Sequence, residues 1–367
     1  MTKMDLLDAV VVGASVVGSN AAYHLAKNGL DALVVEEHSM PGKFGKCSGL
    51  VSKKGLDEIG ADYSSAKVNE VRGATFFCKN QEFTVRSPAV KAIVLNRQVY
   101  DSECARRALD AGAKFAYSNP ATGFSQGAIV KMRVGESVLS TKALIGADGA
   151  SSSVANSLGF AQMQKNNVVL AYEAEFIHST PIDSRMVQLF FDPSFAGFFG
   201  WSIPSGDSAV RIGFGTTDYS AIEAGKKKLF SIPLVVAQLE NAAKCREFSH
   251  LIPLACRKQT QKQNVLLCGD AAGQVKATTW GGIVFGSLCA KIAAREIDLF
   301  VREGKLIEYE AAWRNKFGKT LFAHNVLRGF YNHVDENILS ALMKASRAFG
   351  AQKLFSSFGD MDFIFSA

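Results

Sequence analysis

The sequence lacks clustered metal ligands. Its seven cysteines are scattered along 367 residues, and no two of them form a CxxC pair. The six histidines also show no spacing typical of a metal site. Zinc and iron–sulfur sites built from closely spaced ligands are therefore excluded, and we expect no metal and free thiols in a reducing compartment.

Long apolar runs and dense basic blocks are lacking too. No stretch reaches the roughly 18 uninterrupted apolar residues of a membrane-spanning helix, and the few residues before the first strand leave no room for a signal peptide. We therefore expect a cytoplasmic protein. The net charge of +7 suits an anionic lipid surface or a phosphorylated substrate, and equally an ordinary surface, but it does not indicate nucleic acid.

A dinucleotide-binding pattern is present at the N-terminus. An apolar strand, residues 8–12, leads into Gly13, Ser15 and Gly18, and a helix-like run covers 19–28. Glycines here let the backbone turn tightly and approach a pyrophosphate, which sits on the positive end of the helix. Ser15 stands where the pattern usually has glycine, and its hydroxyl crowds the phosphate but can also donate a hydrogen bond to it.

Two acids complete this βαβ unit. A second apolar strand ends in Glu36 and Glu37, and an acid at this point can accept hydrogen bonds from both hydroxyls of an adenosine ribose. We favour Glu36, because the strand should end there. The unit by itself predicts bound FAD or NAD.

Two later apolar strands also end in aspartate, giving Asp148-Gly149 and Gly269-Asp270. An aspartate at the carboxyl end of a strand can hold a ribityl hydroxyl. The helix that we expect after Asp270 would point its N-terminus at the pyrophosphate. Each pair is common and usually structural by itself, but their order after a βαβ unit favours FAD.

The remaining segments fall into three groups by their residue pattern. We expect three short strands in a small meander, at 114–117, 128–134 and 137–141. Longer apolar strands and a hairpin then predict an antiparallel sheet, at 168–176, 186–191, 201–204 and 209–215. The last part is helical, with four large apolar residues at four-residue spacing on one face: Tyr309, Trp313, Phe317 and Leu321.

In this order, and with Arg97 at the head of a helix, the motifs resemble the FAD-binding proteins of the p-hydroxybenzoate hydroxylase type. Within that superfamily the chain is most similar to geranylgeranyl reductases, especially the archaeal enzymes that saturate the isoprenoid chains of membrane lipids. The resemblance spans nearly the whole chain.

Three segments carry the narrower match. Phe199-Gly-Trp201-Ser-Ile203-Pro204, followed by Gly213-Phe-Gly215, resembles the family's aromatic-x-Trp-x-Phe-Pro…Gly-x-Gly signature, with Phe199 in place of Tyr and Ile203 in place of Phe. Lys46-Cys47-Ser48-Gly49 resembles its cysteine loop beside the flavin. Gly281-Gly282-Ile283 resembles its flavin-contacting glycine run, with the bulky Trp280 where glycine is common.

The resemblance implies an α/β (α+β) fold in which a Rossmann-like FAD-binding domain is made of discontinuous segments, 1–72, 92–160 and 262–300. An antiparallel β-sheet substrate domain, 73–91 and 161–261, is inserted between them, and a C-terminal helical region covers 301–367. The family's pattern further assigns two sets of site residues. The expected FAD contacts are Gly13, Ser15, Val17, Gly18, Glu36, Glu37, Cys47, Ser48, Leu50, Arg97, Ala121, Asp148, Gly149, Asp270, Gly281, Gly282 and Ile283. The expected substrate residues are Phe199, Trp201, Pro204, Gly213, Gly215 and Trp280.

The implied activity is an FAD-dependent reductase that saturates C=C bonds of geranylgeranyl chains, by hydride transfer from N5 of the reduced flavin. The substrate would be an isoprenoid lipid or geranylgeranyl diphosphate. Cys47 is a catalytic candidate, and equally a small buried residue in a tight loop; the sequence marks no general acid. Only one dinucleotide motif exists, so electrons would come from an external donor: ferredoxin, NAD(P)H or another reduced carrier.

Three alternatives remain at this point: a flavin monooxygenase of the same fold, an electron-transfer flavoprotein, and a lipid-binding protein without turnover. The missing cysteine cluster argues against the iron–sulfur versions of the second. Because the presumed substrate lives in membranes, we expect peripheral contact with the inner face of the cell membrane through the basic surface and the C-terminal amphipathic helices.

Overall fold

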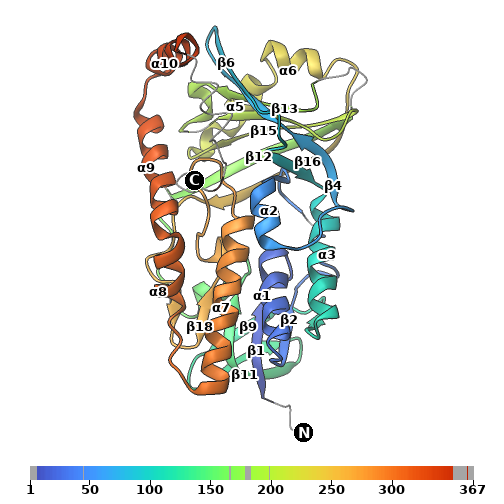
Figure 1. Ribbon diagram of the computed structural model, residues 1–367, viewed down its shortest axis with the longest axis vertical. Helices are drawn as coiled ribbons and strands as arrows, with labels where there is room; N and C mark the ends of the chain where they lie inside the picture. The colour runs from blue at the N-terminus through green and yellow to red at the C-terminus, as the bar shows by residue number, and fades with distance from the viewer. Residues whose placement is uncertain are drawn as a thin grey trace.

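The structure is a computed structural model of the chain, and it describes residues 6–43, 45–164, 167–177, 183–197, 199–349 and 362. Two regions are stacked along the long axis of the molecule (Figure 1). The N-terminal βαβ unit lies in the lower region of that view, and a broad sheet forms the upper one. The fold is mixed α/β, as the sequence predicts.

The lower region is built on an eight-stranded sheet. Its strands are β1 (Leu7–Val12), β2 (Ala32–Val35), β8 (Lys114–Ala116), β9 (Ala121–Ser125), β10 (Val130–Val134), β11 (Ser137–Gly146), β17 (Gln261–Lys262) and β18 (Val265–Leu267). β1 lies between β2 and β11 and pairs in parallel with both, while β18 and β8 extend the sheet in parallel on either side. β9, β10 and β11 form an antiparallel meander at its edge.

Both faces are covered at the centre of this sheet, which explains why β1, β2 and β18 are almost entirely apolar. The covering helices are α1 (Val16–Lys27), α3 (Arg97–Asp110), α4 (Ser153–Ser157) and α7 (Ile283–Glu303). Ala9 and Val11 of β1 pack in the core that contains α1 and α7, whereas Val10 and Val12 pack in the core on the opposite face. Because β1 pairs in parallel with both β2 and β11, the carboxyl ends of these three strands lie together at one edge (Figure 1).

The upper region is a seven-stranded sheet in the order β16-β12-β15-β14-β13-β5-β6. Its strands are β5 (Gly73–Cys78), β6 (Gln81–Arg86), β12 (Val168–Ile177), β13 (Met186–Phe191), β14 (Gly200–Pro204), β15 (Ala209–Thr216) and β16 (Ala243–Pro253). It is antiparallel except where β13 pairs in parallel with β5. One face packs on α5 (Ile222–Leu229) and α6 (Pro233–Gln238), so that Tyr172 and Ala174 of β12 point to these helices and Ala171 and Glu173 to the other side.

A small sheet in the order β3-β7-β4 joins the two regions. Its strands are β3 (Leu50–Ser52), β4 (Lys67–Val71) and β7 (Ala92–Leu95), and the helix α2 (Lys53–Ile59) follows β3 in the chain. β4 and α2 lie between the lower helices and the upper sheet (Figure 1). This junction carries the chain from the cysteine loop into β5.

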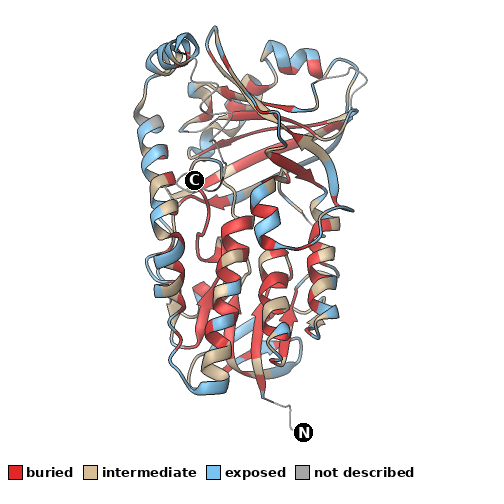
Figure 2. Cartoon of the chain, in the orientation of Figure 1, coloured by how far each residue is buried: buried red, intermediate tan, exposed pale blue. Residues whose placement is uncertain are grey.

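The C-terminal helices run along one side of the molecule from the lower region to the upper one (Figure 1). They are α8 (Tyr309–Trp313), a π-helical turn at Arg314–Gly318, α9 (Lys319–His333) and α10 (Glu336–Ala348). The predicted apolar face is confirmed, since Tyr309, Trp313, Phe317 and Leu321 are all buried in the core beside α7. Large parts of α9 and α10 are exposed (Figure 2). Residues 350–361 and 363–367 of the predicted region 301–367 lie outside the described residues.

Two local expectations were wrong. The strand near 114–117 does not belong to the meander, because β8 pairs in parallel with β2, and the missed strand β9 takes its place beside β10. No α-helix follows Asp270 directly; residues Gly269–Ala271 form a single 3-10 turn, and α7 begins only at Ile283.

Candidate functional site

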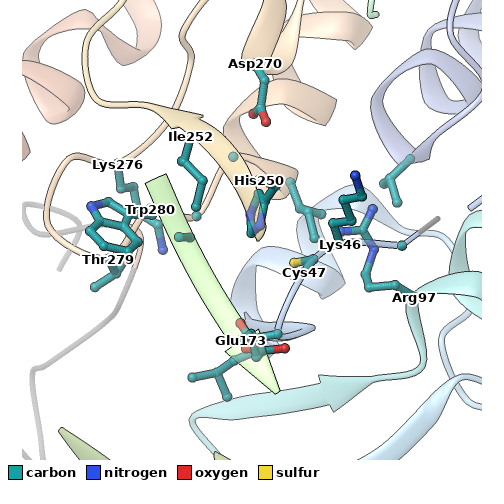
Figure 3. Close-up of a pocket in the computed structure, with 18 of the residues that line it drawn as sticks. Lys46, Cys47, Arg97, Glu173, His250, Ile252, Asp270, Lys276, Thr279 and Trp280 are labelled. Carbon is teal, nitrogen blue, oxygen red and sulfur yellow. The ribbon is translucent and has the colours of Figure 1, made fainter. Parts of the chain in front are cut away.

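One large cavity runs from the dinucleotide-binding turn into the upper sheet. Its volume is about 1350 Å³, which exceeds the roughly 300–1,000 Å³ of pockets for drug-sized ligands. Figure 3 shows its middle, where Cys47, His250 and Glu173 point into the space between Asp270 and β12. The cavity therefore has room for an extended cofactor and for a second ligand.

The turn after β1 is shaped for a backbone approach. Gly13 has φ +100°, and a Cβ there would lie 2.5 Å from the carbonyl oxygen of Ala147. Only glycine fits this close contact between the ends of β1 and β11. Gly18 has the same kind of role one helical turn further, because a Cβ there would overlap the carbonyl oxygen of Gly13.

The two acids after β2 differ in their surroundings. Glu36 Oε2 accepts a hydrogen bond from the backbone N–H of Ala14 at 2.7 Å, and Oε1 accepts one from the N–H of His38 at 2.9 Å. The Glu36 side chain is only 11% exposed, whereas that of Glu37 is 67% exposed. The structure thus fixes the Glu36 carboxylate beside the glycine turn and leaves Glu37 at the rim.

Ser15 belongs to a partly buried polar cluster. Its hydroxyl donates to Asp101 Oδ2 at 2.8 Å and accepts from Arg97 Nη2 at 3.2 Å, while Arg97 Nε donates to Asp101 Oδ1 at 3.0 Å. Burial acts to lower the pKa of Arg97, but Asp101 and the adjacent Cys47 raise this pKa by more than burial lowers it. The net shift is therefore upward, and the guanidinium stays charged. Ser15, which stands where the motif usually has glycine, therefore helps to hold the Arg97 guanidinium at the N-terminus of α1.

The cysteine loop is held against the upper sheet by Arg211 of β15. Its Nη1 donates to the carbonyl oxygens of Ser48 at 2.6 Å and Leu95 at 3.0 Å. Gly49 has φ +70°, and a Cβ there would lie 2.4 Å from the Leu95 carbonyl oxygen and 2.8 Å from Arg211 Nη1. The Cys47 Sγ accepts the Gly49 N–H at 3.4 Å, so the thiol is folded into the loop.

Asp270 lies on the cavity wall opposite Cys47 (Figure 3). Burial raises the pKa of this carboxyl to about 6, against the opposing effect of Arg97. A Cβ on Gly282 would lie 2.5 Å from Asp270 Oδ1, so the glycine run approaches the acid closely. Asp148, in contrast, has a structural role, because its Oδ1 accepts from the Ser152 hydroxyl at 2.6 Å and its Oδ2 from the Val154 N–H at 3.0 Å, at the start of α4.

Contacts with tryptophan rings explain why glycine stands at positions 213 and 215 of the aromatic signature. A Cβ on Gly213 would lie 2.5 Å from the Trp201 ring, and one on Gly215 would lie 1.8 Å from the Trp280 ring. Trp280 also stacks on Phe199, with ring centroids 5.8 Å apart and planes 8° apart. The two glycines of β15 thus leave space for two indole rings, that of Trp201 from β14 and that of Trp280 from the loop before α7.

Trp280 occupies a backbone conformation that favours glycine. Its φ is +58°, in the left-handed region that costs a non-glycine residue roughly 1–3 kcal/mol. This explains why glycine is common at that position in the resembling family. The side chain lines the cavity beside Phe199 and Trp201.

Beyond Trp280 the cavity continues as an apolar arm. The sheet side is lined by Phe76, Phe83, Val85, Leu189 and Phe191, and the helical side by Leu327, Phe330, Leu339, Leu342 and Met343. Phe191 packs on Phe199 with ring centroids 5.6 Å apart, which joins the arm to the aromatic signature.

The structure brings most of the predicted residues to this one cavity. Those that line it are Gly13, Ser15, Val17, Glu36, Glu37, Cys47, Ser48, Leu50, Arg97, Ala121, Asp148, Gly149, Asp270, Gly281, Gly282, Ile283, Phe199, Trp201 and Trp280. Gly18, Pro204, Gly213 and Gly215 do not line it and lie behind the wall. Phe198, which directly precedes the aromatic signature, lies outside the described residues.

Sequence reasoning missed several cavity residues. They are Asp101, Glu173, His250, Lys276 and the residues of α9 and α10. Lys276 is buried and forms an ion pair with Asp362, whose carboxylate also accepts from the Ser52 hydroxyl. Two features of the sequence could have indicated them: Glu173 is an acid within the largely apolar strand β12, and α10 carries an apolar stripe.

Residues 7–283 match the family described as FAD binding domain. A digeranylgeranylglycerophospholipid reductase of Methanocaldococcus jannaschii is 28% identical over 365 residues, which cover 93% of this chain and 90% of that protein. An uncharacterized protein of the same organism is 29% identical over 363 residues, covering 97% and 92%. A digeranylgeranylglycerophospholipid reductase of Methanococcus vannielii is 28% identical over 359 residues, covering 91% and 89%.

Solved structures share the fold. A geranylgeranyl bacteriochlorophyll reductase-like protein of Thermoplasma acidophilum superposes with a TM-score of 0.86 at 21% identity, covering 93% of this chain and 91% of that one. A flavin-dependent brominase superposes with a TM-score of 0.75 at 16% identity, covering 96% and 94%. At these identities the likeness establishes the fold and leaves the reaction to the site.

Proposed function

The chain belongs to the family of proteins with this FAD binding domain, and from that premise we propose that it is a reductase that saturates C=C bonds of geranylgeranyl chains in isoprenoid membrane lipids or their precursors. FAD is its cofactor. The observation that carries the proposal is the single cavity that joins the dinucleotide-binding turn to an apolar arm. The curated relatives named as digeranylgeranylglycerophospholipid reductases support it.

The residues of the flavin end fit FAD. The glycine turn, with no room for a Cβ at Gly13, suits a pyrophosphate at the N-terminus of α1. Glu36 would accept the ribose hydroxyls, and Arg97 would supply a partly buried positive charge beside the turn. Asp270 would take a ribityl hydroxyl. When bound and reduced, FAD supplies the hydride for the reaction.

The apolar arm fits a prenyl chain better than a polar substrate. Its walls are aromatic and aliphatic on both the sheet side and the helical side. Each methylene-sized unit buried there contributes roughly 0.8 kcal/mol, so affinity need not rest on polar contacts. Phe199, Trp201 and Trp280 stand where the arm meets the flavin end, and they would hold an alkene and keep water away from it.

An external donor must reduce the flavin. Because only one dinucleotide motif occurs in the sequence, ferredoxin, NAD(P)H bound outside a Rossmann unit, and other reduced carriers are the candidates that we retain.

We also propose peripheral membrane contact through α9 and α10. No helix among the described residues is long and apolar enough to cross a bilayer. Phe322, Val326 and Ile338 are exposed on these helices and do not line the arm. Helices of this kind lie in the lipid interface. Co-sedimentation with anionic liposomes that weakens as salt rises is expected; no sedimentation would contradict the contact.

Flavin reoxidation tests the proposed reaction. The FAD-loaded protein is reduced with dithionite, freed of excess reductant and mixed anaerobically with geranylgeranyl diphosphate or a geranylgeranyl lipid. We expect the absorbance of oxidised flavin to return, and the fully saturated phytanyl analogue to leave the flavin reduced. A flavin that stays reduced with every unsaturated lipid would contradict the proposal.

A further inference from the structure

A buried carboxylate lies in the cavity wall and is not among the residues expected to hold FAD. Glu173 of β12 is 1% exposed, and its side chain faces the cavity (Figure 3). Trp201 Nε1 donates to its Oε2 at 2.9 Å. The other oxygen, Oε1, is buried and has no hydrogen-bond partner among the described residues. Native proteins rarely leave a buried carboxylate oxygen unpaired, so a missing ligand or proton is indicated.

Three neighbouring strands build this arrangement. Glu173 of β12 and Trp201 of β14 both lie opposite Gly213 of β15. Because Gly213 has no Cβ, the Trp201 ring crosses β15 and reaches the carboxylate on the far strand. The tryptophan and the first glycine of the aromatic signature therefore position Glu173.

The cationic groups nearby are engaged elsewhere. Arg211 Nε bonds Glu175 Oε1 at 3.1 Å, and Arg246 Nε lies 3.5 Å from Glu175 Oε2. Arg211 also holds the cysteine loop. Glu175, on the same strand, adds a negative charge that disfavours ionisation of Glu173.

Two other titratable side chains face this space. Burial raises the pKa of Asp270 to about 6, below that of Glu173, and Asp270 is the residue expected to take a ribityl hydroxyl. His250 of β16 faces the same space, and burial with the nearby Lys46 and Arg97 lowers its pKa to about 4, so its imidazole is neutral near pH 7. Burial raises the pKa of Glu173 to about 7, outweighing the opposing effects of Arg211 and the Trp201 N–H. A general acid works best when its pKa lies near the working pH.

We propose that Glu173 is the proton donor of the reaction, holding its proton on Oε1 and delivering it to the alkene in the cavity. The inference rests on the proposed function. One alkene carbon takes a hydride from the reduced flavin, and the other takes the proton of Glu173. Two C–H bonds form as the π bond, the flavin N–H bond and the carboxyl O–H bond break. The two electrons that the alkene gains would come from the reduced FAD, and Glu173 would be left as a carboxylate that the Trp201 N–H stabilises until solvent returns the proton.

The first test does not depend on turnover. Infrared difference spectra of the flavin-free protein are recorded between pH 5 and 9 for the wild type, Glu173→Gln, Trp201→Phe and the exposed control Glu247→Gln. We expect a protonated-carboxyl band that titrates near pH 7 in the wild type and in the control, and that is missing in Glu173→Gln. Trp201→Phe should move the titration to higher pH, because the carboxylate loses its donor. A spectrum unchanged by Glu173→Gln would overturn the inference.

The second test separates this inference from the proposed function. Reduced FAD-loaded variants are mixed anaerobically with a geranylgeranyl lipid, and the single-turnover rate and FAD affinity are measured. Glu173→Gln should lower the rate by about 10²–10⁴-fold, with FAD affinity and thermal unfolding at pH 5 close to the wild type. A wild-type rate in Glu173→Gln would overturn the role of Glu173 alone. A wild type that reduces no lipid would overturn the proposed function and with it this role, while the titration would still report the protonation of Glu173.

Discussion

Replacing Glu36 by glutamine tests the cofactor site at the position where the sequence leaves two candidates. The carboxylate accepts the N–H groups of Ala14 and His38, one on each oxygen. The amide of glutamine has one accepting oxygen and one donating nitrogen. In the variant Glu36→Gln, one backbone N–H therefore loses its acceptor, and the ribose hydroxyls meet a neutral group.

Two separate losses follow from this geometry. The unpaired backbone N–H should lower the stability of the flavin-free protein by about 1–3 kcal/mol. The charge-assisted contact to the ribose contributes roughly 1.5–3 kcal/mol, so its loss should weaken FAD binding by roughly 10- to 150-fold. Glu37→Gln is the matched control, since the Glu37 side chain is 67% exposed and should change neither quantity.

Quenching of flavin fluorescence gives the dissociation constant of FAD, and thermal unfolding without flavin gives the stability. Loss of stability in Glu36→Gln with unchanged FAD affinity would show that the carboxylate only braces the turn. Weaker binding in Glu37→Gln than in Glu36→Gln would refute the choice between the two acids.

Three further predictions concern the rest of the cavity. Because the folded pKa of Glu173 is raised from 4.5 to about 7, the wild type should lose up to about 3 kcal/mol of stability as pH rises through that window. Urea unfolding at pH 5 and pH 8 should show this loss of stability in the wild type and not in Glu173→Gln. The same change in unfolding free energy between the two pH values in both proteins would contradict the prediction. Gly215→Ala should destabilise the protein by about 1–3 kcal/mol, because the added Cβ displaces the Trp280 ring. Adding Trp280→Gly to the same chain should relieve this clash. If the losses of the two substitutions in thermal unfolding simply add, the two residues do not clash as described. Leu342→Lys, at the arm, should raise the KM for geranylgeranyl diphosphate about tenfold, the equivalent of about 1.5 kcal/mol of lost burial, whereas Ile338→Lys on the same helix should not; equal effects would place the arm elsewhere.

Features that depend on neighbouring residues could be predicted from the sequence. The turn at Gly13 and the end of β2 at Glu36 follow from apolar runs and glycine spacing, which act locally. The face that carries Tyr309 and Trp313 follows from helical periodicity, and the π-helical turn after Trp313 did not disturb it.

Features that depend on pairing between distant segments could not. The partner of β8 is chosen by the parallel sheet, and a three-residue strand carries too little pattern to reveal it. Glu173 looks like one acid in an apolar strand until Trp201 is seen to reach it across β15. Likewise, the stripe of α10 predicts an amphipathic helix but not that Leu342 lines the same cavity as Gly13.

Mass spectrometry of the lipid itself tests the central claim most directly. A defined geranylgeranyl lipid is incubated anaerobically with the dithionite-reduced, FAD-loaded protein, and its mass is compared with that from flavin-free protein under the same conditions. The account predicts that the lipid gains two hydrogen atoms for each double bond reduced, and only when the loaded protein is present. An unchanged lipid mass with a properly loaded and reduced protein, for the diphosphate and for the membrane lipid alike, would contradict it.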